Sequence, residues 1–327
     1  MLPSRLNLLA ILVIAAVCVT LPWLVNDYWM RVATKVMMFA LLGSAWNVIA
    51  GYCGYPSFGQ VAFFGLGAYV TAVLMVQFHW PFLGGMVVAI AVAAAFAALV
   101  GLAVLRLRGH YFAIASLGVA EALRQVVANM TLTGGGEGIS FPLPPWPPAT
   151  TTLIFYYAMG AVLAAMLFTL WWSLHSRLGF AWRAIRVNEQ AAQIVGINST
   201  TYKVAAWTIS AAFTGAAGAI YGYWISFIEP NSVFSVNISV ELIVCSLLGG
   251  VGTIVGPVIG AAVFEVMSEL VWANFLNAHG LVLASLFAAV ILLLPRGLVG
   301  LVGPEAFARA ARIWRGHVHE RDVAETR

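Results

Sequence analysis

This sequence has little charge. Only 9% of its 327 residues are Asp, Glu, Lys or Arg, whereas soluble domains carry about 25%. From Val36 to Leu105 there is no charged residue at all, a run long enough for about three transmembrane helices. The low charge excludes an ordinary soluble domain. The continuous apolar runs exclude a β-barrel, whose strands alternate polar and apolar residues, so the spans are expected to be helices.

Residues for catalysis are also scarce. The three cysteines lie in apolar segments without metal-binding spacing, and we expect them to be small buried side chains. Neither lysine, Lys35 or Lys203, follows a glycine, so the chain has no phosphate-binding G-x-x-x-x-G-K-[ST] loop. No Ser-His-Asp or paired-carboxylate arrangement is present. We therefore predict a protein that is not an enzyme and has no catalytic, cofactor-binding or metal-binding residues. The net charge of +4 suits a membrane surface better than nucleic acid.

The apolar segments predict an all-α polytopic membrane bundle of about 8–10 transmembrane helices, some interrupted by glycine. Residues 1–300 form the transmembrane domain, and residues 301–327 form a polar cytoplasmic tail. The first apolar segment lacks a small-x-small cleavage site, so it is predicted to be an uncleaved span rather than a signal peptide. Crossings are expected near residues 6–25, 31–50, 57–78, 82–105, 111–130, 151–174, 204–228, 237–250, 255–272 and 280–295.

Lys and Arg in short loops predict the orientation of these spans. The basic residues of the 106–110 loop, the 176–203 loop and the C-terminal tail fall on one side in this scheme, together with the N-terminus. The 131–150 loop falls on the other side and has no Lys or Arg. Both termini are therefore predicted to be cytoplasmic. Arg31 and Lys35 do not fit this orientation, because the scheme places them near the outer face. Either they snorkel at the start of a span or the number of spans near them is wrong.

Two glycine clusters interrupt the helical pattern, at residues 51–60 and 249–260. Glycine and proline together disrupt helices, and irregular backbone at membrane depth needs shelter from protein or a water-filled path. Paired interrupted segments are typical of a transport path, whereas small residues also allow helices to pack closely. Both readings stay open. The residues that would line a path are Gly54, Ser57, Gly59, Gln60, Gly250, Gly252, Thr253 and Gly256.

A charged island, Ser176–Lys203, separates two long apolar segments. Asn188 is a good N-cap, Glu189 suits the first turn of a helix, and Gly196 is a natural stop. A second short amphipathic helix is expected at Phe180–Arg186. Two short helices of this kind would form a rigid projection able to transmit motion, although a solvated basic loop that only fixes topology would show the same composition.

A few charges fall within or beside the predicted spans. Glu121 and Arg124 are three residues apart on one helix face, so we expect them to pair. Glu265 and Glu269 share another face near an outer helix end. An exposed outer surface is the simpler interpretation of that acidic pair, and a proton or sodium site is the alternative.

Four stretches resemble one family in the same order along the chain. They are Gly51–Leu74, the Leu105–Ile114 segment leading to Thr133–Ile139, Arg183–Asn198 and Leu248–Gly260. Together they are similar to the permeases of branched-chain amino-acid ABC importers of the LivM type. General importer loops have Glu-Ala-Ala, three residues and Gly; here Gln190-Ala191-Ala192 precedes Gly196, with Glu189 one position early.

The resemblance implies a multi-pass subunit of the bacterial inner membrane in an ATP-driven importer of leucine, isoleucine and valine. Its implied partners are a second homologous permease, two cytoplasmic ATPases that use the ATP, and a periplasmic binding protein. The resemblance assigns ATPase coupling to Arg183, Arg186, Glu189, Ala191, Ala192 and Gly196. Related permeases carry urea, short amides or other small organic solutes, so the substrate stays open. An ion-coupled secondary transporter using Glu121 or Glu265 is a rival, and a channel is a weaker one.

Overall fold

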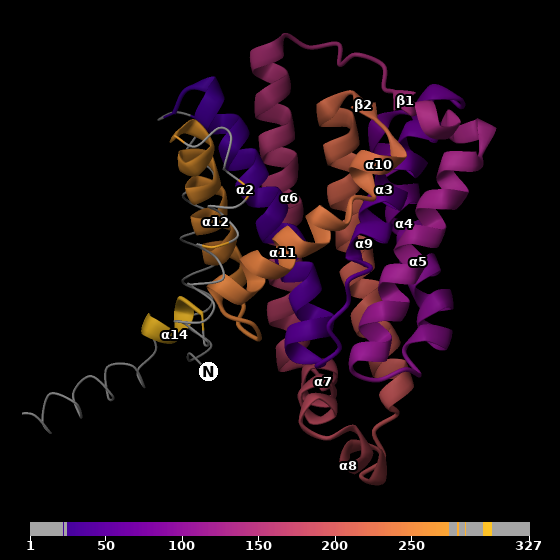
Figure 1. Ribbon diagram of the computed structural model, residues 1–327, viewed down its shortest axis with the longest axis vertical. Coiled ribbons are helices and arrows are strands. Elements are labelled where there is room, and N and C mark those ends of the chain that lie inside the picture. The colour runs from indigo at the N-terminus through magenta and orange to yellow at the C-terminus, as the bar shows by residue number, and fades with distance from the viewer. Residues whose placement is uncertain (1–21, 23–24, 275–279, 281–284, 286–296, 303–327) are drawn as a thin grey trace, which may run out of the picture.

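The computed structural model describes residues 25–274 and 297–302, together with positions 22, 280 and 285. Within these residues the chain is almost entirely helical, as the sequence predicts (Figure 1). The long helices are α2 (Asp27–Asn47), α3 (Gln60–Val76), α4 (Phe82–Val104), α5 (His110–Asn129), α6 (Pro148–His175), α9 (Ser199–Ile225), α11 (Val236–Gly249) and α12 (Gly256–Asn274).

Six of the helical segments are long and apolar enough to cross a membrane. They are Asp27–Tyr52, Phe82–Val104, His110–Asn129, Thr150–His175, Ser199–Ile225 and Pro230–Gly249. The helix Gln60–Val76 is apolar but shorter, and α12 occupies the predicted 255–272 span. The predicted crossings at 6–25 and 280–295 fall almost entirely outside the described residues, as does the tail at 301–327.

The remaining elements lie at the two ends of the bundle. The short helices α7 (Arg177–Val187) and α8 (Glu189–Ile194) project from the lower end in Figure 1. At the upper end, β1 (Ile139–Ser140) pairs antiparallel with β2 (Phe227–Ile228) beside α10 (Pro230–Val233). Two 3₁₀ turns, Thr131–Thr133 and Gly135–Glu137, precede β1, and a short helix α14 (Val299–Val302) lies near the C-terminus.

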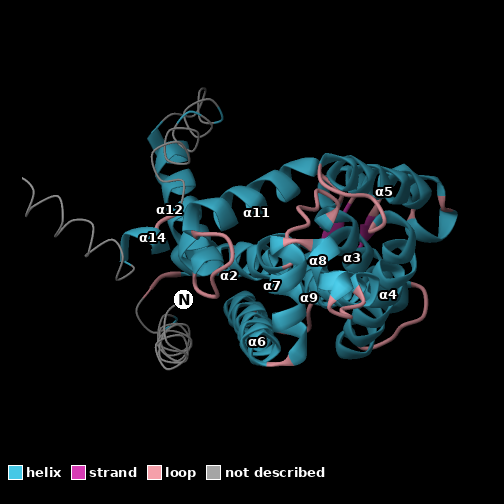
Figure 2. Cartoon of the chain, turned by 90° about the horizontal axis from the view of Figure 1, so that it is seen from below, coloured by secondary structure: helices cyan, strands magenta, loops and turns pink. Residues whose placement is uncertain are grey.

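Burial separates central from peripheral helices. In the 18-residue apolar stretch of Asp27–Tyr52, 83% of the residues are buried, and in that of Ser199–Ile225, 61% are buried. In the corresponding stretches of α4 and α5, only 22% are buried. In the view of Figure 2, α12 lies beside α2, away from α4 and α5, whereas α11 runs from α12 toward α5. Helices α2 and α9 therefore form the core of the bundle, and α4 and α5 present most of their surface outward.

Small residues allow α9 to approach its neighbours closely. A Cβ atom at Gly67 of α3 would lie 2.0 Å from the carbonyl oxygen of Gly215, and one at Gly218 of α9 would lie 1.9 Å from that of Phe64. On α4, a buried stripe of small residues recurs every four positions: Gly85, Ala89, Ala93, Ala97 and Gly101. Close packing of this kind holds membrane helices together where the hydrophobic effect between helices is weak.

Candidate functional site: the α7–α8 projection and its anchors

The charged island folds as two capped helices, because side chains at its turns supply the hydrogen bonds that helix ends lack. The Ser176 hydroxyl accepts from the backbone N–H of Leu178 at 3.2 Å at the start of α7. Asn188 Oδ1 accepts from the N–H of Ala191 at 3.1 Å at the start of α8. Gly196 follows α8 with a φ of +89°, a conformation that favours glycine. The caps at Asn188 and Gly196 are those that the sequence predicts, whereas the cap at Ser176 was not predicted, and α7 begins three residues earlier than expected, at Arg177.

The projection carries an apolar tip formed by Val187, Ile194 and Val195. Their side chains are 87%, 86% and 75% exposed. The tip lies at the end of the bundle beyond the long helices (Figure 1), where water rather than lipid would surround it. Exposed apolar side chains grouped in this way are typical of a protein–protein contact surface.

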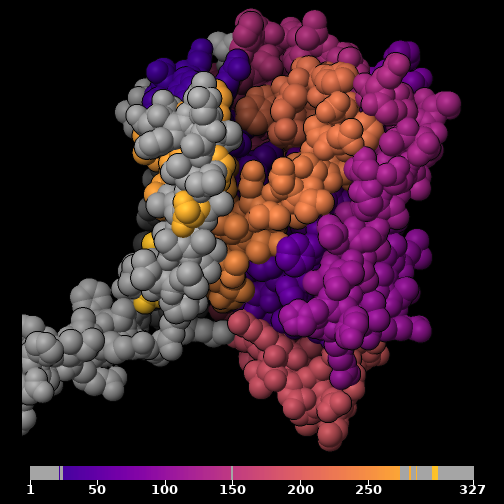
Figure 3. Space-filling view, viewed as in Figure 1, coloured from indigo at the N-terminus to yellow at the C-terminus, as the bar shows by residue number. Residues whose placement is uncertain are grey.

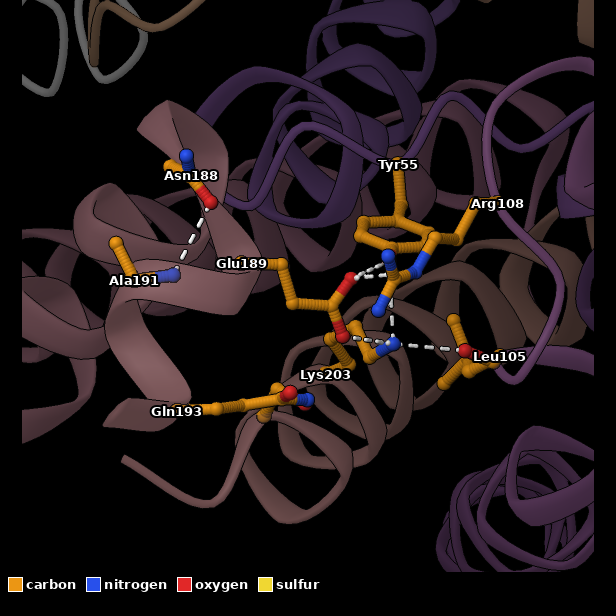
Figure 4. A network of polar contacts seen from close by, with 9 residues as sticks. Tyr55, Leu105, Arg108, Asn188, Glu189, Ala191, Gln193 and Lys203 are labelled. Atoms are coloured by element: carbon orange, nitrogen blue, oxygen red, sulfur yellow. Dashed lines mark hydrogen bonds and ion pairs between the residues drawn. The ribbon is translucent and has the colours of Figure 1, made fainter. Parts of the chain in front are cut away.

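The first anchor of the projection is Glu189, whose carboxylate points into the bundle (Figure 4). Lys203 Nζ lies 2.8 Å from Glu189 Oε1, and Arg108 Nε lies 3.4 Å from Oε2. The Tyr55 hydroxyl donates to Oε2. Lys203 is itself buried and also donates to the carbonyl oxygen of Leu105 at 2.8 Å. One carboxylate thus joins α8 to the first glycine cluster, the α4–α5 loop and α9.

These contacts keep the Glu189 carboxylate charged. Burial raises the pKa of Glu189, but hydrogen bonds from Lys203, Tyr55 and Ser199 outweigh it, so the pKa lies below its usual value. Burial and the hydrogen bond to Glu189 raise the pKa of Tyr55, which therefore stays protonated and able to donate. The anchor thus combines one anion, the cations Lys203 and Arg108, and the neutral donor Tyr55.

The second anchor is Arg186 at the end of α7. Its guanidinium donates to the carbonyl oxygen of Gly51 in the first glycine cluster. A Cβ atom at Gly252 would lie 2.7 Å from Arg186 Nη1, so the second glycine cluster also touches this side chain. Arg183 donates to the carbonyl oxygen of Gly179 at 3.0 Å and to that of Leu174 at 3.3 Å. Both arginines thus bind the backbone of their own chain.

The two glycine clusters meet at Asn47. The chain widens from α2 into a π-helix, Val48–Tyr52, directly after this residue. Asn47 Nδ2 donates to the carbonyl oxygen of Thr253 at 2.7 Å, and Oδ1 accepts from the N–H of Gly252 at 2.8 Å. The two interrupted segments are therefore held together, and Arg186 connects both of them to the projection.

Most residues predicted to line a path are packed in this structure. A Cβ atom at Gly59 would lie 2.3 Å from the Ser116 carbonyl oxygen, and one at Gly256 would lie 2.4 Å from that of Gly250. Ser57 Oγ accepts from the N–H of Gly59 at 3.2 Å, and Gln60 Nε2 donates to Ser210 and Thr214. Close packing accounts for these positions, and a path along them stays a prediction.

The unusual backbone of the clusters changes what some substitutions would test. Gly54, Gly250 and Gly252 have φ values of +83°, +124° and +80°. Alanine at Gly252 would be strained by about 1–2 kcal/mol from its backbone alone, so Gly252→Ala would disturb packing before it reported on a path.

Ala192 is buried against its own chain, whereas Ala191 is exposed. Position 192 is therefore unsuitable for probing a partner.

Sequence reasoning missed Asn47, Tyr55 and Arg108 as members of the site. Lys203 was noted only as the end of the charged island, although it is one of two lysines in the chain. A buried lysine at the start of a membrane helix needs an acidic partner, and the nearest carboxylate in the island is Glu189. That reasoning could have found the pair, but nothing local points to Tyr55 or Arg108.

Known proteins define the class to which this structure belongs. Residues 28–294 match the family described as "Branched-chain amino acid transport system / permease component". The chain belongs to this family of multi-pass membrane permeases.

Two relatives carry the name high-affinity branched-chain amino acid transport system permease protein LivM. The one from Salmonella typhimurium (strain LT2) is 32% identical over 92% of this chain and 76% of its own length. The one from Escherichia coli (strain K12) is 31% identical over the same shares. The LivH permease of S. typhimurium is 24% identical, over 80% of this chain and 91% of its own length. No solved structure matches the chain.

Proposed function

We propose that this chain is the membrane-spanning subunit of an ATP-driven importer that carries leucine, isoleucine and valine across the bacterial inner membrane. A second homologous permease completes the membrane part. Two cytoplasmic ATPases bind the projection α7–α8 and hydrolyse ATP, which this chain does not do itself. A periplasmic binding protein delivers the substrate to the opposite end. The names of the LivM and LivH relatives support the amino-acid substrate.

The observation that carries this proposal is the construction of the projection. An apolar tip stands free for a partner, while Glu189 and Arg186 fix the base of the same two helices to the interrupted segments. A movement imposed at the tip would therefore reach α9 and both glycine clusters. A secondary transporter has no need of such a lever, because its energy enters through the coupled ion.

Reconstitution tests the function directly. The permease pair, the ATPases and the binding protein are assembled in proteoliposomes, and uptake of radiolabelled leucine is measured. We expect uptake to require both ATP and the binding protein, and to be insensitive to collapse of proton and sodium gradients. Uptake driven by an ion gradient without ATP would instead establish the secondary transporter, and uptake of urea but not leucine would reassign the substrate.

The proposed orientation places α7, α8 and both termini in the cytoplasm and the 131–147 segment in the periplasm. Cysteine labelling in a cysteine-free background tests it at two exposed positions, Leu143 and Ile194. An impermeant thiol reagent should label a Leu143→Cys variant in intact spheroplasts and an Ile194→Cys variant only after lysis. The reverse pattern would invert the topology.

A further inference from the structure

A charged cluster lies where α2, α11 and α12 meet. Lys35 Nζ of α2 lies 2.9 Å from Glu265 Oε2 of α12, and only 1% of the Glu265 side chain is exposed. The other oxygen, Glu265 Oε1, is buried without a hydrogen-bond partner. Glu241 of α11 lies within Coulombic range of both Lys35 and Glu265. Among the described residues, no hydrogen bond or ion pair involves the Glu241 carboxylate.

This cluster lies at membrane depth. Lys35 is eight residues beyond the first residue of α2, Asp27, which places it about 12 Å below the helix end. The span Asp27–Tyr52 has 26 residues, or about 39 Å, against a hydrocarbon thickness of about 30 Å. Lys35 therefore lies within the hydrocarbon layer rather than at its edge, and its side chain turns to Glu265 instead of snorkelling outward.

Among the described residues, the side chains beside this cluster are partly exposed. The Lys35 side chain is 46% exposed, and α11 lies on the surface of the molecule in Figure 3 (orange). Charged groups at this depth are too costly to face lipid, so they face a partner or a water-filled cavity. The surface of α2 and α11 around Lys35 therefore does not face lipid, and we assign it to the interior of the assembled transporter.

One lysine faces two carboxyl groups in this cluster. Lys35 pairs with Glu265, and Glu241 adds a second carboxyl group nearby. Glu269, one turn beyond Glu265, accepts a hydrogen bond from the Tyr28 hydroxyl and adds further negative potential at Lys35.

A second intramembrane pair provides a comparison. Arg124 lies 2.5 Å from Glu121 and also donates to Asn231 at 2.6 Å. That pair is neutral and self-contained, as the sequence predicts. The α2–α11–α12 cluster differs because Lys35 is paired with Glu265, whereas the Glu241 carboxylate has no hydrogen bond or ion pair among the described residues.

We propose that this cluster is a subsite for the zwitterionic head group of an α-amino acid on its way through the membrane. The substrate ammonium group interacts with the Glu241 carboxylate, and the substrate carboxylate interacts with Lys35, whose side chain is half-exposed. A zwitterion offers a positive charge to the acidic side of the cluster and a negative charge to the half-exposed lysine. The subsite rests on the proposed function, since it takes its ligand from the importer's substrate.

Glutamine substitution tests the subsite in the reconstituted complex. We expect Glu241→Gln to slow leucine uptake at least tenfold, while the permease pair still copurifies with the ATPases and the binding protein still stimulates ATP hydrolysis. Glu241→Asp, which keeps the charge, should retain at least a third of the uptake. Glu121→Gln removes a carboxylate from a similar depth on α5 and should stay within twofold of wild type.

Thiol labelling separates a substrate site from a proton site or a static ion pair. In a Glu241→Cys variant, a cationic methanethiosulfonate should react at least tenfold faster than an anionic one, and leucine should slow that reaction during turnover. Unchanged uptake in Glu241→Gln, or labelling that leucine does not slow, would overturn the subsite. Failure of the wild-type complex to take up leucine with ATP would overturn the proposed function instead.

Discussion

An Ile194→Asp, Val195→Asp double variant is expected to lose ATP-driven uptake while the permease still accumulates in the membrane. Both side chains are more than 70% exposed, so the change should cost the chain little of its own stability, within about 0.5 kcal/mol per site. If the apolar tip forms the centre of the ATPase contact, two buried charges there should cost about 2 kcal/mol or more each. That corresponds to at least about 30-fold weaker binding per residue.

Copurification of the ATPases with the tagged permease is the first measurement, and leucine uptake is the second. Leu143→Asp is the matched control, because Leu143 is 83% exposed but lies between β1 and α6, and β1 is at the opposite end of the bundle from α7 and α8. The ATPases should still copurify with the Leu143→Asp control variant. Normal copurification of the double variant would show that the tip is not the docking surface.

Replacing Lys203 with methionine is expected to separate ATP hydrolysis from transport. The change leaves the Glu189 carboxylate without its buried cation, and breaking a buried ion pair in this way costs about 3–5 kcal/mol. The apolar tip is untouched, so the ATPases should still bind. Because the ion pair that joins α8 to α9 would be lost, we expect uptake to fall at least tenfold while ATP hydrolysis continues.

Thermal unfolding in detergent and uptake per ATP hydrolysed are the two measurements. The double variant Glu189→Gln, Lys203→Met should lower thermal stability and uptake by less than the sum of the two single variants, because neither buried charge is then left without its partner. Arg106→Met is the control, since Arg106 is an exposed basic residue at the same end that donates only to the carbonyl of Leu102 at 3.1 Å. If the Lys203→Met variant took up as much leucine per ATP hydrolysed as wild type, the Glu189 contacts would not transmit motion from the ATPases.

The parts of the fold that depend on local sequence were predictable. Apolar runs located the long helices because membrane spans need about 20 such residues. The caps at Asn188 and Gly196 were predictable because each satisfies backbone groups within a few residues of itself. The pairing of Glu121 with Arg124 follows from helix periodicity and is present in the structure.

The anchors could not be predicted, because they join residues that are far apart in the chain. Arg186 was expected to present its charge to a partner, but its guanidinium binds the Gly51 carbonyl 135 positions away. Asn47 lies inside an apolar run and showed no sign of a role, although it bridges to a backbone 205 residues later. Nor does the sequence distinguish the π-helix at Val48–Tyr52 from a continued α-helix. These features arise from tertiary packing.

The network around Glu189 also fixes an order of events during synthesis. Tyr55 leaves the ribosome 134 residues before Glu189 and 148 before Lys203. By then α3, α4, α5 and α6 have all been made, yet the first glycine cluster still lacks the partners that hold it. The contacts of Tyr55 with Glu189 and Lys203 can form only when α8 and the start of α9 emerge, so the end of the bundle that carries α7 and α8 is completed late, after its outer helices have been made.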